Sequence, residues 1–290
     1  MSEYASMIRK EWAANDAKRD AGLTIPEEIQ RFDNLTYGIV DQKWQKLDVY
    51  RLKYKTGKLP VILSIHGGGW VYGDKDLYQY YCMSLAQKGF AVVNYSYRLA
   101  PEYQYPSSFE DTTMVADWIM DHAEKYGFDT EHIFGVGDSA GAHMLSLYAA
   151  ALTNSQYFVP YPLAKGFSFC AIALNCGIYH LQPETMGETM QLMKDFLPKG
   201  GTSEELHDIS PINYVNEKFP PCFIMTCPGD FLNAAPEELV AVLKKNSVPF
   251  VYRTYGNQKN PLTHDFHCNM RLAEAKLCNE EECRFFQEFC

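Results

Sequence analysis

The feature that most constrains the fold is a five-residue turn between an apolar strand and a helix. Residues 132–136 read His-Ile-Phe-Gly-Val, as expected for a buried strand, and Gly-Asp-Ser-Ala-Gly (137–141) follows directly. Residues 142–147 then have helical patterning. The flanking glycines let strand and helix approach closely, and the strained turn raises the serine hydroxyl above the sheet. A glycine- and serine-rich helix cap is the plainer interpretation, but this context favours Ser139 as a nucleophile.

The rest of the chain predicts an α/β protein with a mostly parallel sheet. Apolar or alternating runs predict strands at 47–54, 59–65, 90–95, 166–173, 222–227 and 250–255. Helical patterning at 77–88, 108–126 and 268–289 alternates with them, which is typical of a parallel sheet covered by helices. Residues 2–32 predict one or two N-terminal helices, the second starting at Pro26. Residues 178–216 break the alternation as an insertion, and the 290 residues are expected to form one domain.

A serine hydroxyl needs a base, and histidine suits that role near neutral pH. After a turn of this kind the acid and then the histidine follow the serine along the chain. His264 and His267 lie in the loop after the last predicted strand, where the base is expected. We favour His264 because it comes first and leaves the start of the last helix to later residues. His267 is the alternative.

The acid is expected after the penultimate strand, and Asp230 follows the run 222–227 almost directly. Its carboxylate would accept the imidazole N–H, fix the tautomer and stabilise the imidazolium formed during attack. A helix-capping role is the alternative for Asp230, although Asn233 fits that role better.

Attack on a carbonyl also needs donors aimed at the developing oxyanion. The segment His-Gly-Gly-Gly (66–69) leaves a predicted strand with three residues that lack side chains, so that their amides can line a cavity. Ala140, directly after the nucleophile, supplies another N–H. A phosphate-binding loop is disfavoured because the sequence has neither a Walker lysine pattern nor GxGxxG.

Together these motifs resemble the hormone-sensitive-lipase-like esterases of the α/β-hydrolase superfamily, also called bacterial family IV esterases. The resemblance covers most of the chain and is carried by HGGGW at 66–70, YRLAPE at 97–102 with Pro106 and Asp111, GDSAG at 137–141 and HDF at 264–266. It implies an α/β-hydrolase fold with a small helical cap built from residues 1–32 and 178–216. It also implies an oxyanion hole formed by Gly68, Gly69 and Ala140.

Two positions depart from that family's pattern. Phe231 replaces the proline of an Asp-Pro-Leu tripeptide, and Asp265 follows the histidine where the family usually has glycine. The second change is expected to alter the charge near the base. In the YRLAPE segment, Arg98 and Glu102 are expected to form an internal ion pair without a catalytic role.

The predicted function is a serine carboxylesterase that hydrolyses short-chain acyl esters, acetyl esters above all, through an acyl-enzyme. The acetyl preference follows from the short cap that the resemblance implies. Methionines at 186, 190 and 193 with Phe196 either line an acyl pocket or, as ordinary packing, belong to the core. Two alternative functions, carbohydrate acetyl esterase and arylformamidase, would use the same triad. A third alternative is not an enzyme: a receptor with a hydrolase-like fold that binds a small molecule without cleaving it.

The composition excludes several other partners. The formal net charge of -10 and the lack of basic clusters argue against nucleic acid. A polar N-terminus and no apolar run of membrane length predict a cytoplasmic protein without membrane insertion. Nine cysteines without CxxC spacing predict reduced thiols rather than a disulfide framework or metal site. No cofactor or metal is expected, the partner is a small-molecule ester, and a homo-oligomer is compatible with the sequence.

Overall fold

The computed structural model describes residues 1–290, the side chain of Thr185 excepted. Its centre is an eight-stranded sheet in the order β1-β2-β4-β3-β5-β6-β7-β8. The strands are β1 (Ile29–Thr36), β2 (Lys46–Leu52), β3 (Leu59–Ile65), β4 (Ala91–Tyr95), β5 (Phe128–Asp138), β6 (Ala171–Asn175), β7 (Cys222–Thr226) and β8 (Phe250–Thr254). β2 pairs antiparallel with β1 and β4, whereas β4, β3, β5, β6, β7 and β8 are mutually parallel. The mostly parallel sheet is confirmed.

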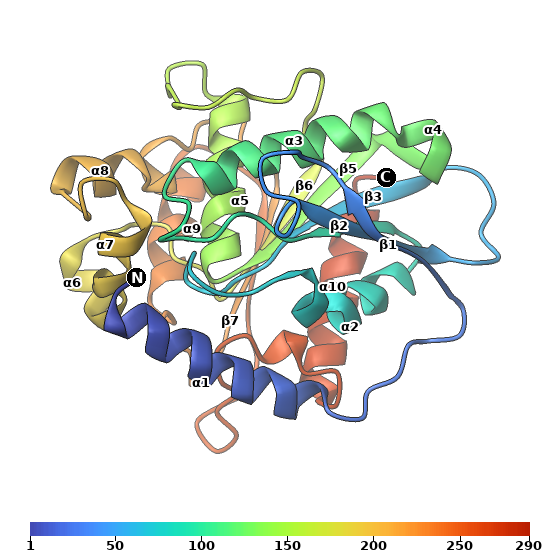
Figure 1. Cartoon of the computed structure of the whole chain (residues 1–290), viewed down its shortest axis with the longest axis horizontal. Helices are drawn as coiled ribbons and strands as arrows, with labels where there is room; N and C mark the ends of the chain where they lie inside the picture. Colours follow the sequence, from blue (N-terminus) through green and yellow to red (C-terminus); the bar gives the residue numbers. More distant parts are fainter.

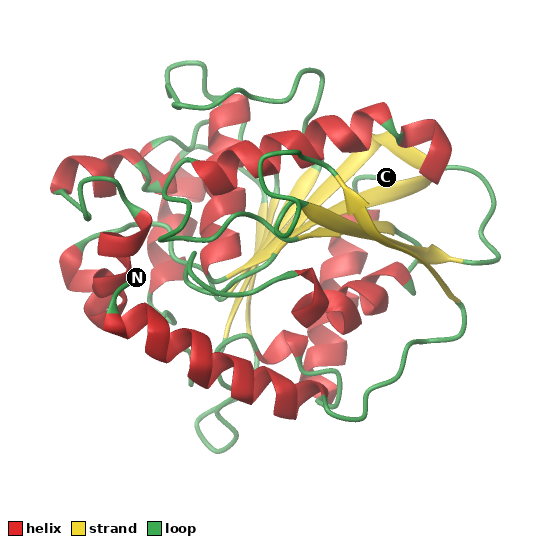
Figure 2. Ribbon diagram, viewed as in Figure 1, coloured by secondary structure: helices red, strands yellow, loops and turns green.

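Helices cover both faces of this sheet (Figure 1, Figure 2). The longer helices are α1 (Glu3–Asp20), α2 (Lys75–Ala86), α3 (Ser107–Asp121), α5 (Ala140–Thr153), α9 (Ala235–Lys245) and α10 (Ala273–Gln287). Shorter ones are α4 (Ala123–Tyr126), α6 (Pro183–Met186), η1 (Gly187–Leu192), α7 (Met193–Phe196), α8 (Ser203–Asp208), η2 (Pro211–Asn213) and η3 (Phe266–Cys268).

Neighbouring side chains along the central strands point to opposite faces and enter two separate apolar cores. In β3, Val61 and Leu63 belong to the core that packs against α3 and α5, while Ile62 belongs to the core beneath α2 and α10. All three are fully buried. This two-sided burial explains why the strand reads as a continuous apolar run.

The expected second N-terminal helix is wrong. Residues 29–36 form edge strand β1, which pairs with β2 from Ile29 opposite Leu52 to Thr36 opposite Lys46. Ile29 is 3% exposed, so pairing and burial at the sheet edge outweigh the helix-start signal at Pro26. The strand expected at 166–173 begins later, at Ala171, and Gly166 adopts a left-handed φ of 71°, outside the β region of regular strands.

Residues 178–216 form the expected helical insertion, α6 to η2. α1 runs beside it (Figure 1), and the backbone N–H of Ser2 donates to Asp195 Oδ1 at 3.0 Å. Farther along α1, Arg9 forms an ion pair with Glu102 at 2.8 Å. In the part of the chain that the structure describes, no helix is long and apolar enough to cross a membrane.

The expected ion pair between Arg98 and Glu102 is therefore wrong. Arg98 Nε instead lies 2.9 Å from Asp111 Oδ1, and Arg98 Nη2 lies 2.9 Å from Glu110 Oε2. Glu102 points toward α1, which only the tertiary structure brings to this place.

Candidate active site

Ser139 sits at the turn between β5 and α5 with a left-handed φ of 50°. Glycine is required on both sides of Ser139, at positions 137 and 141, because other backbone atoms lie where a Cβ would be. A Cβ on Gly137 would lie 2.6 Å from the carbonyl oxygen of Gly141, and one on Gly141 would collide with the carbonyl oxygen of Ile65. The turn thus presses α5 against β3 and β5, and it leaves Ser139 8% exposed beside a cavity.

Asp230 and His264 follow β7 and β8, so parallel pairing brings them to the same edge of the sheet as Ser139. His264 Nδ1 lies 2.7 Å from Asp230 Oδ1. Thr226 Oγ1 donates to Asp230 Oδ2 at 3.0 Å, and the N–H of Leu232 donates to Oδ1 at 2.9 Å. Burial acts to raise the pKa of Asp230, but the His264 partner and these donors outweigh it, and the net shift is downward. The carboxylate is therefore held ionised against the imidazole.

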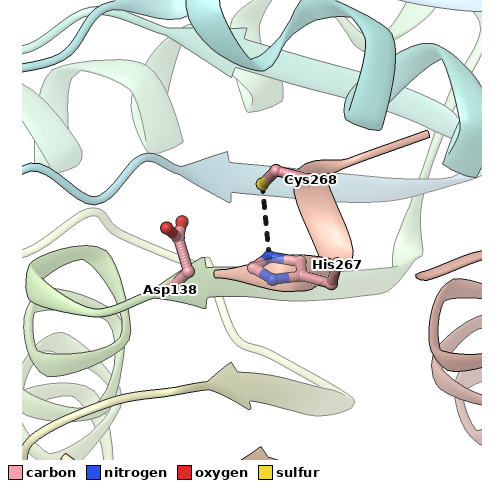
Figure 3. Close-up of side chains that lie close together, drawn as sticks. All are labelled: Asp138, His267 and Cys268. Atoms are coloured by element: carbon pink, nitrogen blue, oxygen red, sulfur yellow. Dashed lines mark hydrogen bonds between the residues drawn. The ribbon is translucent and has the colours of Figure 1, made fainter. Parts of the chain in front are cut away.

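The alternative histidine, His267, lies elsewhere. It is fully buried, and its Nε2 is 3.5 Å from Cys268 Sγ (Figure 3). Burial, together with the charges of His264 and Arg19, lowers the pKa of His267 to about 3. A neutral, enclosed imidazole without access to Ser139 is a packing residue, so the geometry favours His264 as the base.

Figure 3 also shows Asp138 beside His267 and Cys268. One donor atom from each of these three residues lies within 4.8 Å of the others, close enough to surround a metal ion. The Asp138 carboxylate already has other partners, however. The N–H of Gly67 donates to its Oδ1 at 3.1 Å and Tyr78 Oη donates to its Oδ2 at 2.6 Å. Asp138 thereby ties the glycine loop after β3 to the nucleophile turn.

The proposed oxyanion donors lie on both sides of Ser139. Gly68 and Gly69 have left-handed φ values of 115° and 58°. A Cβ on Gly68 would collide with the carbonyl oxygen of Tyr72, and one on Gly69 would lie 2.8 Å from Leu192 Cδ1. Ala140 is the first residue of α5, and a helix leaves its first N–H groups without a carbonyl partner of its own. These positions suit backbone donors to an anionic oxygen.

A second carboxyl group contacts the imidazole. Asp265 Oδ2 lies 3.2 Å from His264 Nε2, and Asp265 is close enough to Asp138 for the charge of one to act on the other. Among the described residues no hydrogen bond links Ser139 Oγ to His264, a bond that in free enzymes often tightens only with substrate. Burial raises the pKa of Asp138 to about 6 and, with the nearby charges of Asp138 and Asp230, raises that of Asp265 well above its usual range.

Ser139 and His264 line one cavity of about 470 Å³. Its opposite wall is α1, which contributes Trp12, Asp16 and Arg19. The methionine-rich stretch does not face this cavity. Met186, Met193 and Phe196 are buried in the core, where Phe196 stacks on Trp70 with 4.9 Å between ring centroids. The packing interpretation of that stretch is the better one.

Sequence reasoning missed Asp138, Tyr78 and the α1 residues of the cavity wall. Asp138 lies inside the pentapeptide at 137–141, and a buried acid next to a candidate nucleophile is a signal that could have been used. No local pattern marks Tyr78 or α1, because their roles depend on contacts with distant segments. Asp265 was noticed only as an unusual neighbour of His264.

Comparison with known proteins adds independent evidence. A family model described as BD-FAE matches residues 47–235. Esterase LipC of Mycobacterium tuberculosis is 29% identical over 194 residues, covering 64% of this chain but only 48% of LipC, so the chain spans about half of that relative. Acetyl esterase of Salmonella schwarzengrund is 28% identical over 241 residues, 78% of this chain and 71% of that protein.

A solved structure agrees with these relatives. Esterase B of Lactobacillus rhamnosis has a TM-score of 0.87 and 26% identity, covering 98% of this chain and 94% of that one. The α/β-hydrolase fold and the resemblance to hormone-sensitive-lipase-like esterases are thereby confirmed.

Proposed function

The chain belongs to the BD-FAE family and is a carboxylic ester hydrolase, and we propose that it cleaves short-chain acyl esters, acetyl esters above all, with Ser139 as nucleophile, His264 as base and Asp230 as acid. The observation that carries the proposal is the 2.7 Å contact between His264 and Asp230 beside the cavity that Ser139 also lines. Gly68, Gly69 and Ala140 form the oxyanion hole in this proposal.

In the first half-reaction, Ser139 Oγ attacks the ester carbonyl while His264 Nε2 takes the hydroxyl proton. The imidazolium is stabilised by ionised Asp230, and the carbonyl oxygen becomes an oxyanion that accepts hydrogen bonds from the three backbone N–H groups. When the intermediate collapses, the bond to the alcohol oxygen breaks and His264 returns the proton to the leaving alcohol. For this step Ser139 Oγ and His264 Nε2 must come within hydrogen-bond reach.

In the second half-reaction, water attacks the acyl-Ser139 ester. His264 again accepts a proton, the carboxylic acid leaves, and Ser139 regains its hydrogen. Each half-reaction uses the same base and the same oxyanion donors, so loss of any one triad member is expected to disable both.

The short-acyl preference has two supports. The Salmonella relative is described as an acetyl esterase. Esterase B of Lactobacillus rhamnosis has also been crystallised with a C4-C4 SN3 tributyrin phosphonate, and that structure has a TM-score of 0.86 to this chain. The cavity of about 470 Å³ that Ser139 and His264 line is large enough for such a substrate.

The test combines active-site labelling with a substrate series. A fluorophosphonate should attach to Ser139 with loss of fluoride, and peptide mass spectrometry should locate the adduct there and find none in Ser139→Ala. We expect kcat/KM for p-nitrophenyl acetate to exceed that for the octanoate by about tenfold or more. Labelling at another residue would reject the nucleophile. Rapid turnover of N-formylkynurenine with inert esters would favour an arylformamidase.

A further inference from the structure

The two carboxyl oxygens of Asp265 lie in different surroundings. Oδ1 is buried with no hydrogen-bond partner among the described residues, and the charge of Asp138, another acid, acts to raise the pKa of Asp265. A proton on one of the two carboxyl groups relieves the repulsion between them. Oδ2 faces His264 Nε2 at 3.2 Å, and the side chain remains 23% exposed. Of the two oxygens, Oδ2 is therefore the one that can accept a hydrogen bond from a molecule in the cavity that Asp265 lines.

The backbone fixes this arrangement. Asp265 has a left-handed φ of 56°, and aspartate is among the few residues with a side chain that adopt this conformation readily. The left-handed turn aims the carboxyl group toward the cavity, which Asp265 lines together with Ser139 and His264. The backbone conformation and the contact with His264 thus position Asp265.

The cavity wall opposite Asp265 adds little positive charge of its own. Arg19 lines the cavity but forms ion pairs with Asp16 at 2.8 Å and with Asp20 at 2.7 Å. Asp16 also accepts a hydrogen bond from Tyr72 Oη at 2.7 Å. The guanidinium is therefore already matched by two carboxylates. Its charge acts to lower the pKa of Asp265 but does not outweigh burial.

We propose that Asp265 is a specificity-determining residue that recognises the leaving alcohol, favouring esters whose alcohol carries a hydroxyl or ammonium donor next to the ester oxygen. This inference rests on the proposed function, because it takes His264 as the residue that protonates the leaving group. That group's oxygen must come within hydrogen-bond reach of Nε2, and Asp265 Oδ2 is 3.2 Å from the same atom. A hydrogen-bond donor one or two carbons from the ester oxygen of the alcohol can then bind Oδ2. A carboxylate in the same position would face the carboxyl group of Asp265 and bind poorly.

Three acetates of similar size provide the test: propyl acetate, 2-hydroxyethyl acetate and 2-(dimethylamino)ethyl acetate. Their hydrolysis can be followed by titration of released acid. Wild-type kcat/KM, divided by each ester's rate of alkaline hydrolysis, should be several-fold higher for the two donor-bearing esters than for propyl acetate. Equal normalised values would overturn the proposal without any variant. Acetoxyacetate, which places an anion there, should be the poorest substrate.

Two variants isolate the side chain. Asp265→Gly suits the left-handed backbone and should lower the ratio of hydroxyethyl to propyl ester by about 5- to 10-fold, as expected for one lost hydrogen bond. Asp265→Asn keeps an oxygen acceptor and should mainly lower the ratio for the ammonium ester. Unchanged ratios in both variants would reject Asp265 as the determinant.

Asp16→Asn is the matched control, since it removes an acid from the same cavity. If it lowers the ammonium ratio as much as Asp265→Asn does, the general charge of the cavity and not Asp265 is responsible. Ser139→Ala separates this inference from the proposed function. Loss of all three activities in Ser139→Ala with unchanged ratios in the Asp265 variants would refute only the specificity role, whereas activity retained in Ser139→Ala would refute the function itself.

Discussion

Two buried carboxyl groups in this molecule have opposite partners. Asp111, beside β4, accepts hydrogen bonds from the backbone N–H of Arg98 at 2.7 Å, from Arg98 Nε at 2.9 Å and from Gln45 Nε2 at 2.8 Å. Asp138, which directly precedes Ser139, has two uncharged donors, Gly67 N and Tyr78 Oη. Neither carboxyl group is more than 1% exposed. Asp111 is paired with a cation, Arg98, whereas Asp138 lies near a second acid, Asp265.

This difference separates scaffold from reaction centre. Burial raises the pKa of Asp111, but Arg98 counteracts that effect, so the pair can remain charged and fix the loop after β4. At Asp138 no cation counteracts burial to the same degree, and the pKa rises to about 6. Such protonatable buried acids are concentrated at functional sites. Variants in the two regions should therefore change different quantities. In the reaction centre we expect changes in activity and in the pH dependence of stability, and in the scaffold we expect a loss of stability without a loss of activity.

The largest effect is expected in the reaction centre. Asp230→Asn keeps the shape of the side chain but offers His264 an amide, which no longer enforces the required tautomer. We expect kcat to fall by about 10⁴-fold, with a much smaller change in the denaturant midpoint. Steady-state kinetics on p-nitrophenyl acetate and urea unfolding measure the two quantities. A loss below tenfold would mean that another acid serves His264.

On the scaffold side, Arg98→Met should leave Asp111 buried without its cation. The expected cost is about 3 to 5 kcal/mol of unfolding free energy, measured by urea denaturation, while kcat of the folded fraction stays near the wild-type value. Glu102→Gln is the control, because Glu102 is 52% exposed, its partner is Arg9, and such pairs contribute at most about 1 kcal/mol. Equal losses in both variants would contradict the distinction between buried and exposed pairs.

The smallest of these effects concerns pH. The pKa of Asp138 is about 6 in the folded chain against a usual value of 3.8, so the folded state binds this proton more tightly than the unfolded state. Its contribution to stability is then fully present below pH 3.8 and is lost as pH rises through 6. The loss amounts to about 3 kcal/mol if Asp138 titrates alone, and less if Asp265 shares the proton.

Asp138→Asn removes this titration. The difference in unfolding free energy between wild type and variant should therefore shift in favour of the variant between pH 4 and pH 7. Chemical denaturation at several pH values provides the measurement. Glu204→Gln, at a 73% exposed side chain, should give a curve parallel to wild type. A parallel curve for Asp138→Asn as well would show that its pKa is not raised.

Much of the fold could be predicted from the sequence, because strands and helices are marked by local patterns of burial. The runs at β3, β4, β5, β7 and β8 were recognised in this way, as was the turn at Ser139. The failures also have local causes. Pro26 resembled a helix start, but residues 29–36 gain more from pairing with β2, and pairing at a distance leaves no signal in the segment itself.

In the candidate site, too, some features follow from local sequence patterns and others only from contacts between distant segments. The sequence by itself determined Ser139, because strand, turn and helix around it are contiguous, and it placed Asp230 and His264 at strand ends. Only the tertiary structure decided which histidine meets Asp230, which acid meets Arg98, and that α1 closes the cavity. His264 and His267 are three residues apart, yet one faces the cavity and the other the core. Local patterns encode backbone conformation and burial, whereas partners are chosen by how distant segments pack together.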